Sequence, residues 1–192
     1  YDNVFVRIRG GTATSWPKKA YKIELNEDHE FQFDAELPRV TEFDQNTTYT
    51  DKSYCRAILT TELHQDSGTH SPITFPMRVQ QNGEFYSVSL YVEQPDKDFL
   101  RRGNLDPEGV YYKANPGSFY NSVSPFEKKT RRYESGKADA QEFIDGLRLT
   151  GAERENFLFD VADLPAQINF MAGVVITQNI DASDKNHFLY RD

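Results

Sequence analysis

The sequence predicts an α+β protein, with an antiparallel sheet in the N-terminal half and helices in most of the C-terminal half. Three observations lead to this class. Before residue 114, several runs alternate between apolar and polar residues, as half-buried strands do. An Asn-Gly pair joins two of these runs, and this pair is the strongest short-range signal of a β-hairpin. After residue 137, apolar residues recur every three or four positions, which is the spacing of one helix face.

The first two strands are expected on either side of a glycine turn. Val4–Ile8 and Lys19–Leu25 both alternate, and the residues between them are mostly small. Within the second run Lys19 shares the face that is expected to be buried. Its neighbours Lys18 and Lys22 are therefore expected to point away.

A helix is expected after a polar connection. Residues 34–50 are polar, and Asp51 is a suitable N-cap for a helix that ends near His64. Cys55, Leu59 and Leu63 lie at four-residue spacing and should form its buried face.

A β-hairpin is expected next. Ile73–Val79 and Tyr86–Val92 flank Asn82-Gly83, two residues that tolerate the positive φ of a tight hairpin turn. A short helix over Asp96–Arg102 should follow.

The second half of the chain is mostly helical, with a strand at each end. The expected elements are a strand over 110–113, helices over 138–149, 152–159 and 164–179, and a final strand over 187–192. Residues 115–136, with a basic patch at 128–132, predict a mobile solvated loop. Asp163 and Pro165 suit the start of the last helix, and its nearly continuous apolar surface predicts that this helix is buried.

Composition excludes several classes of protein. With 22 Lys and Arg against 30 Asp and Glu, the net charge of -8 argues against binding to nucleic acid. The single cysteine, Cys55, permits neither an internal disulfide nor a cysteine-based zinc site. No apolar run reaches the length of a membrane span. Because the chain begins and ends within strand-like runs, it is expected to be a piece of a longer protein.

The segment that follows the last helix concentrates polar residues. Asp181, Asp184, Asn186 and His187 fall within seven positions between a helix and a strand. An Asp and an Asn five residues apart match the protein-kinase catalytic loop, in which the Asp accepts a proton and the Asn binds a metal. A capped turn between a helix and a strand explains the same residues equally well.

The glycine turn is the second candidate site. Gly10, Gly11 and Thr12 would let backbone N–H groups approach a phosphate, although a plain turn is the commoner explanation. Lys19, if directed inward, needs an anionic partner, either a phosphate or a carboxylate such as that of Glu62. Glu62 is also compatible with an exposed helix position, and Trp16 with either base stacking or a core position.

Three stretches together resemble the CotH kinase family, the spore-coat protein H-like atypical protein kinases. These stretches are Arg9–Thr12 with Trp16–Ile23, Asn82–Glu93, and Asn179–Asp181 with Asn186–Asp192. The resemblance covers nearly the whole chain in the same order. It implies a divergent protein-kinase-like fold that transfers the γ-phosphoryl group of ATP to Ser or Thr of a protein substrate, with Mg²⁺ or Mn²⁺.

The resemblance also implies roles for individual residues. Asp181 would be the catalytic aspartate, Asn186 the metal ligand, and Glu93 to Asp96 the hinge near the adenine. The expected nucleotide-binding residues are Gly10, Gly11, Thr12, Lys19, Glu62 and Glu93. Residues 1–113 would form a nucleotide-binding lobe and 114–192 a helical lobe with the catalytic loop.

Family members continue into an acidic metal-binding segment that would follow Asp192. Without it, the 192-residue piece is expected to be inactive. Two other functions remain open: a non-catalytic scaffold domain of a secreted or surface protein, and a metal-dependent hydrolase using Asp181, Asp184 and His187. The family's usual places are the spore coat and the cell exterior.

Overall fold

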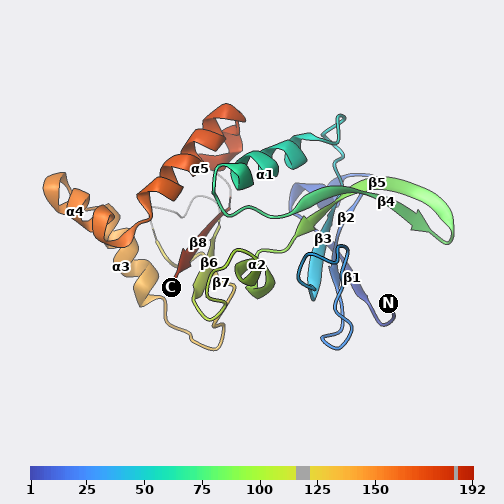
Figure 1. Ribbon diagram of the computed structural model, residues 1–192, viewed down its shortest axis with the longest axis horizontal. Helices are drawn as coiled ribbons and strands as arrows, with labels where there is room; N and C mark the ends of the chain where they lie inside the picture. The colour runs from blue at the N-terminus through green and yellow to red at the C-terminus, as the bar shows by residue number, and fades with distance from the viewer. Residues whose placement is uncertain (116–121, 184–185) are drawn as a thin grey trace. The chain divides into compact units, whose positions relative to one another are not determined.

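The computed structural model describes residues 1–115, 122–183 and 186–192, which include two antiparallel sheets and five α-helices, as the predicted α+β class requires (Figure 1). The chain divides into two compact units. Unit 1 comprises residues 1–65 and 70–104, and unit 2 comprises residues 66–69 and 105–192. This division falls nine residues before the one expected from the sequence, and the strand over 110–114 lies in unit 2.

Unit 1 is built on a five-stranded antiparallel sheet with the strand order β1-β2-β3-β5-β4. The strands are β1 (Phe5–Arg9), β2 (Ala20–Glu24), β3 (Glu42–Asn46), β4 (Thr74–Gln81) and β5 (Glu84–Glu93). Helix α1 (Arg56–Asp66) connects β3 to β4, and α2 (Lys97–Arg102) follows β5. The predicted hairpin is confirmed: β4 and β5 pair around Asn82 and Gly83, whose φ angles are 53° and 85°.

The central strand β3 was not predicted, because its sequence is polar. Glu42, Asp44 and Gln45 alternate with little apolar character, yet Asp44 is 3% exposed and Gln45 8%. Strand β3 pairs with β2 on one side and β5 on the other. Both faces of this strand are covered, so position in the sheet and not hydrophobicity determines its burial.

An aromatic cluster covers one face of the unit 1 sheet. Tyr91, on β5, is fully buried, and its ring lies 4.6 Å from that of Phe75, 4.8 Å from Phe33 and 5.0 Å from Phe43. Phe31 joins the cluster through its contact with Phe43. The connection between β2 and β3, which the sequence left without assigned structure, therefore supplies part of the core.

Helix α1 begins later than expected and exposes its expected core positions. Asp51 lies five residues before the helix and is not its N-cap residue, although its carboxylate accepts a hydrogen bond from the N–H of Arg56 at 3.0 Å. Cys55 is exposed, and the side chain of Leu59 is 60% exposed. The buried residue of this helix is His64.

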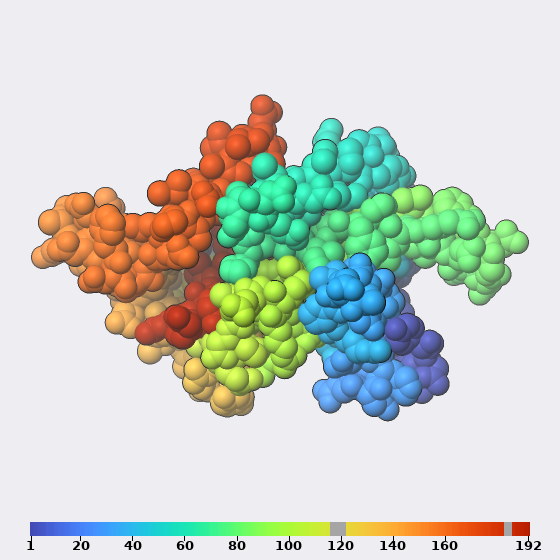
Figure 2. Space-filling model, in the orientation of Figure 1, coloured from blue at the N-terminus to red at the C-terminus, as the bar shows by residue number. Residues whose placement is uncertain are grey.

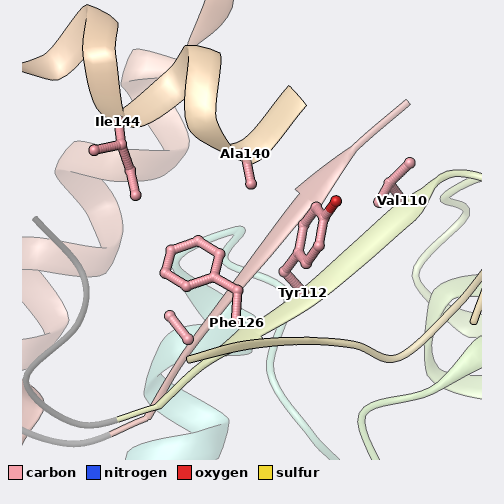
Figure 3. Close-up of a cluster of buried hydrophobic side chains, with 6 residues drawn as sticks. Val110, Tyr112, Phe126, Ala140 and Ile144 are labelled. Atoms are coloured by element: carbon pink, nitrogen blue, oxygen red, sulfur yellow. The ribbon is translucent and has the colours of Figure 1, made fainter. Parts of the chain in front are cut away.

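Unit 2 has a three-stranded antiparallel sheet in the order β7-β6-β8, and, among the described residues, three α-helices lie between β7 and β8 in the chain. Its elements are β6 (Val110–Ala114), β7 (Phe126–Lys128), α3 (Ala138–Leu147), α4 (Gly151–Val161), α5 (Leu164–Ile176), a 3₁₀ turn at Ile180–Ser183 and β8 (His187–Arg191). The core lies between the sheet and α3, and it contains Val110, Tyr112, Ala114, Phe126, Ala140 and Ile144 (Figure 3).

The expected mobile loop over 115–136 contains ordered structure where it is described. Strand β7 pairs with β6, Phe126 is 2% exposed, and the buried Thr130 hydroxyl donates to the carbonyl of Gly109 at 2.7 Å. Residues 116–121 of this segment lie outside the described residues. The Ser, Pro and Lys content concealed a three-residue strand that only pairing with β6 defines.

Helix α5 is correctly predicted, but it is not buried. Asp163 accepts a hydrogen bond from the N–H of Ala166 at 3.0 Å, as expected of its N-cap. Ile168, Met171 and Val175 are 67%, 58% and 71% exposed, because the unit 2 core forms against α3 instead. Figure 2 shows this helix at the surface (orange). In the described residues no single helix is long and apolar enough to cross a membrane; α4 and α5, bent by 97°, meet that criterion only as a pair.

Candidate functional site

The proposed catalytic-loop segment links α5 to β8 in unit 2. After Thr177 the chain passes through Gln178, whose φ is 51°, into the 3₁₀ turn that holds Asp181. Pairing of β8 with β6, which places His187 opposite Ala114, fixes the other end of the link. The carboxylate of Asp181 and the amide of Asn186 are both on exposed residues, open to a substrate. Asp184 lies outside the described residues.

The donors in this link suit a hard divalent cation with few protein ligands. Mg²⁺ prefers oxygen ligands and usually keeps several waters beside one or two protein side chains. Asp181 and Asn186 supply one carboxylate and one amide oxygen. The described part of the chain contains no group of three or more His, Cys, Asp or Glu side chains that could hold a metal by themselves. This donor set fits a metal that is also bound by substrate phosphates.

The glycine turn between β1 and β2 is closed by its own hydrogen bonds. Gly10 has φ 94°, and a Cβ there would come within 3.1 Å of the Ala13 Cβ, so this position favours glycine. The Thr14 hydroxyl donates to the Gly11 carbonyl at 2.6 Å, and the Lys19 Nζ donates to the Thr14 carbonyl at 2.8 Å. Gly11 and Thr12 are exposed.

The expected orientations of Lys19 and Lys18 are wrong, whereas Lys22 does point away from the face of Tyr21. Lys19 contacts its own turn and not Glu62, which is exposed on α1. Lys18, expected to point away, donates from Nζ to the Thr48 hydroxyl at 3.2 Å and to the Val88 carbonyl. Lys22 is only 13% exposed and pairs with Glu42. The physical reason for the first two is that β2 begins at Ala20, so strand alternation does not extend to them.

Glu93 has a structural contact at the end of β5. Its carboxylate receives the Arg102 guanidinium at 2.8 Å (Nε to Oε1) and 2.7 Å (Nη2 to Oε2), and it accepts the N–H of Ile73 at 3.0 Å. The Arg102 Nη2 also donates to the Ser71 carbonyl at 2.7 Å. Glu93 therefore ties α2 and the start of β4 to the end of β5, and its side chain is fully engaged.

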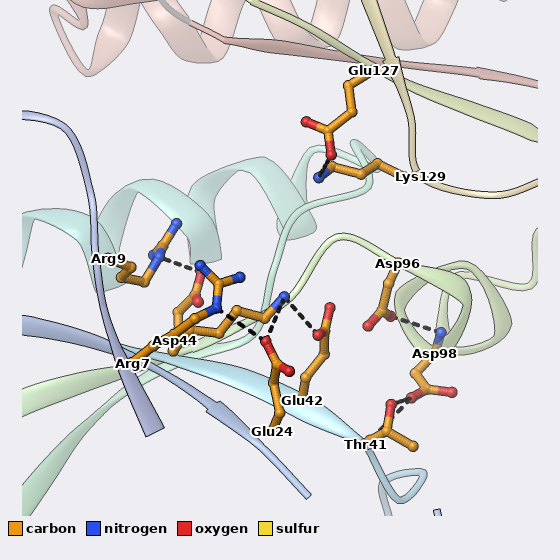
Figure 4. A network of polar contacts seen from close by, with 11 residues as sticks. Arg7, Arg9, Glu24, Thr41, Glu42, Asp44, Asp96, Asp98, Glu127 and Lys129 are labelled. Atoms are coloured by element: carbon orange, nitrogen blue, oxygen red, sulfur yellow. Dashed lines mark hydrogen bonds and ion pairs between the residues drawn. The ribbon is translucent and has the colours of Figure 1, made fainter. Parts of the chain in front are cut away.

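A charged face of the unit 1 sheet was missed by the sequence analysis. The Arg9 Nη1 lies 2.6 Å from Asp44 Oδ2, the Lys22 Nζ lies 2.6 Å from Glu42 Oε2, and Arg7 pairs with Glu24 (Figure 4). These residues share one face because β1, β2 and β3 pair in register. Alternation of charge within each strand, as in Arg7–Ile8–Arg9, was the available signal, but the partner strand β3 had not been recognised.

Two carboxyl groups of unit 1 have raised pKa values. Burial raises the pKa of Asp44 to about 6 against the opposing effect of Arg9, and the Asp44 Oδ1 has no hydrogen-bond partner. Burial, and then the nearby charge of Asp98, raises the pKa of Asp96 to about 7. Asp96 caps α2 through the N–H of Asp98 at 2.8 Å. Perturbed carboxyls of this kind accompany functional sites but also structural ion-pair networks.

The described residues define an α+β protein whose first unit carries a glycine turn on an antiparallel sheet and whose second unit carries an Asp–Asn link between a helix and a strand. The chain belongs to the CotH kinase protein family, whose profile matches residues 6–192. It is 23% identical over 201 aligned residues to the inner spore coat protein H of Bacillus subtilis (strain 168), and the alignment covers 98% of this chain. The same alignment covers 54% of that relative, so the chain spans about half its length.

Proposed function

We propose that this chain is the nucleotide-binding and catalytic-loop part of an ATP-dependent protein kinase with a divergent protein-kinase-like fold, which phosphorylates Ser or Thr. The observation that carries the proposal is the pair Asp181 and Asn186, five residues apart on a helix-to-strand link, in a chain of the CotH kinase protein family. The antiparallel sheet of unit 1, with a glycine turn between its first two strands and a helix between the third and fourth, agrees with this reading.

In the proposed reaction the acceptor hydroxyl oxygen attacks the γ-phosphorus of ATP, and the bond from that phosphorus to the β–γ bridging oxygen breaks to release ADP. Asp181 accepts the hydroxyl proton as that bond forms. Asn186 would hold Mg²⁺ or Mn²⁺, which supplies neutralisation of phosphate charge. Both side chains are exposed, so neither has to leave a protein contact that the structure records before it meets a substrate.

In unit 1 the proposal assigns the phosphates to the turn of Gly10, Gly11 and Thr12. Lys19 contributes by holding the turn closed through the Thr14 carbonyl. Glu93 positions the connection from β5 to α2, where the adenine is expected, through its ion pair with Arg102. Its own carboxylate is not free to bind the base.

The test is transfer of labelled phosphate from ATP to a Ser-rich acceptor, with Mg²⁺ or Mn²⁺, by the natural full-length polypeptide that contains this chain. Asp181→Ala should reduce the rate at least about a hundredfold, since it removes the proton acceptor. Asp160→Ala, an exposed aspartate on α4, is the matched control and should leave the rate unchanged. Equal transfer by the Asp181→Ala protein would rule out the assigned role.

A second candidate function is a non-catalytic component of the spore coat. The observation in its favour is the name of the relative, an inner spore coat protein. This function requires neither nucleotide nor metal. It predicts that the full-length protein transfers no label. Both candidate functions predict that the protein is found in the coat, so label transfer distinguishes them.

A further inference from the structure

Two lysines beside the glycine turn carry positive charge that no carboxylate neutralises. The Lys18 Nζ contacts a hydroxyl, a backbone carbonyl and, at 5.1 Å, the ring of Tyr54. The Lys52 Nζ donates to the Tyr49 carbonyl at 2.7 Å and lies 4.6 Å from the centroid of the Tyr49 ring. All of these partners are neutral, and all lie in unit 1.

The nearest acidic side chain in the same loop is already engaged. The Asp51 carboxylate accepts hydrogen bonds from the N–H and hydroxyl of Ser53, at 3.0 and 2.6 Å, and from the N–H of Arg56 at 3.0 Å. The Arg56 Nε lies a further 3.7 Å from it. Lys22, by comparison, has Glu42 at 2.6 Å. Among the described residues, therefore, no recorded ion pair supplies a carboxylate to Lys18 or to the exposed Lys52.

The two ammonium groups also act on each other. Burial lowers the pKa of Lys18, and the positive charge of Lys52 lowers it further. A partly desolvated ammonium beside a second ammonium is unfavourable unless an anion binds nearby. An anion that carries several negative charges compensates both lysines at once.

The loop that carries Lys52 is held against the glycine turn in a strained conformation. Thr48 and Tyr54 have φ angles of 51° and 61°, a region that β-branched and bulky residues rarely adopt. The buried Thr47 hydroxyl anchors the loop by donating to the Lys18 carbonyl at 2.6 Å. Backbone strain of this kind is often retained where a ligand is bound.

Aromatic rings lie beside the lysines. The ring of Trp16, from the glycine turn, is 5.6 Å from that of Tyr49, and the side chain of Tyr54 is 39% exposed. We propose that Lys18 and Lys52 bind the phosphate chain of the nucleoside triphosphate, next to the Trp16–Tyr49 pair. The inference rests on the proposed kinase function and assigns the phosphate contact to Lys18 and Lys52 instead of Lys19.

The chain offers a local probe for this site, because Trp16 is its single tryptophan. The experiment follows tryptophan fluorescence while ATP, inorganic tripolyphosphate or adenosine is added to the protein. ATP and tripolyphosphate should change the signal with saturation, and adenosine should not. Raised salt should weaken both responses, since the contact is between charges near the surface.

Four variants then identify the lysines. Lys18→Met should weaken tripolyphosphate binding at least about tenfold, and Lys52→Met about threefold to tenfold, because each removes a charged hydrogen-bond donor. Arg78→Met, which removes an exposed cation on β4 of the same unit, is the matched control and should change the affinity less than about twofold. Lys18→Arg, which keeps the charge, should bind within about threefold of the parent and shows that any loss in Lys18→Met is not misfolding.

Each outcome decides the inference. The inference would be overturned by unchanged binding in Lys18→Met, or by an equal loss in the Arg78→Met control. A response to adenosine equal to that to ATP, or no response to any phosphate compound by fluorescence and calorimetry, would also overturn it. The kinase proposal is judged separately by label transfer. If Lys18→Met loses phosphate binding but the unmutated protein transfers no label, the phosphate site is supported and the kinase proposal is ruled out. If Lys18→Met transfers label normally, the kinase proposal is supported and the phosphate site is ruled out.

Discussion

The two antiparallel sheets of the molecule are stabilised in different ways. The five-stranded sheet of unit 1 buries Asp44, Gln45, Ser89 and Glu93 beside its aromatic cluster. The core of the three-stranded sheet in unit 2 is mainly apolar, and its buried polar groups include the hydroxyl of Tyr112, which donates to Asp139 at 2.8 Å, and that of Thr130, which donates to the Gly109 carbonyl at 2.7 Å. Unit 1 therefore depends on the pairing of buried charges, and unit 2 on packing.

The pKa values of carboxyl groups are shifted in opposite directions in the two units. In unit 1, burial raises the pKa values of Asp44 and Asp96. In unit 2, a hydrogen bond from Arg131 lowers the pKa of the half-buried Glu134, and one from Lys129 lowers the pKa of the exposed Glu127. Lowering the pH should thus stabilise the folded form through Asp44 and Asp96 and destabilise it through Glu127 and Glu134.

The largest expected effect comes from breaking the buried ion pair of unit 1. Glu93→Ala leaves the Arg102 guanidinium, 19% exposed, without its carboxylate. We expect the free energy of unfolding of unit 1 to fall by about 3–5 kcal/mol. Denaturant unfolding followed by Trp16 fluorescence measures it, with the exposed Glu84→Ala on the same strand as control. A loss equal to that of the control would mean that unit 1 does not depend on this pair.

The corresponding change in unit 2 removes packing and not charge. Ile144 is 1% exposed in the core between α3 and the sheet, so Ile144→Ala should cost about 2–5 kcal/mol by lost burial and cavity formation. Hydrogen exchange of the β6 and β8 amides measures the loss. If those amides keep their protection, the core drawn in Figure 3 does not stabilise the sheet.

A change of pH tests the contrast without a core mutation. Because the pKa of Asp44 is raised, its contribution to stability is complete below the ordinary value near 3.8 and is lost as the pH rises through about 6. Unit 1 should therefore unfold with a larger free energy at pH 5 than at pH 8, by about 1.5 kcal/mol from this group. Asp44→Asn should reduce the difference by that amount, as Trp16 fluorescence would show. An unchanged difference would exclude Asp44 as its source.

For unit 2 we expect the opposite dependence of stability on pH. The ion pairs of Glu127 and Glu134 contribute above pH 4.5 and are lost as the pH falls through their lowered pKa values. Amide protection in β7 should therefore decrease on acidification below pH 4.5, and Glu134→Gln should make it less sensitive to pH. The side chains of Glu127 and Glu134 are 50% and 33% exposed, so solvent screens both ion pairs and the effect is small.

Local signals in the sequence identified most elements but not their surroundings. The β4–β5 hairpin follows from Asn82-Gly83, and the start of α5 from Asp163 and Pro165, because turns and caps are local. Strand β3 was missed because pairing on both sides, and not its composition, makes it a strand. The same limit applies to Lys18, whose contacts come from Thr48 and Val88, distant in sequence.

The candidate catalytic residues were easier to find than the charged ones around the sheet. Asp181 and Asn186 lie on one continuous segment, so their spacing was visible in the sequence. The pairs Arg9–Asp44 and Glu93–Arg102 join different elements, and their partners depend on strand register and helix placement. Contacts of that kind cannot be read from periodicity alone.

The smallest expected effect comes from α5, whose apolar surface predicted a buried helix. Ile168 lies on α5 with 67% of its side chain exposed, whereas Ile144 is buried on α3. Ile168→Gln removes little buried area and keeps a good helix former, so the free energy of unfolding should change by less than about 0.5 kcal/mol. Amide exchange in α5 measures it beside the Ile144→Ala protein. A loss as large as that of Ile144→Ala would show that the apolar face of α5 is covered in solution, and that unit 2 has a second packed layer.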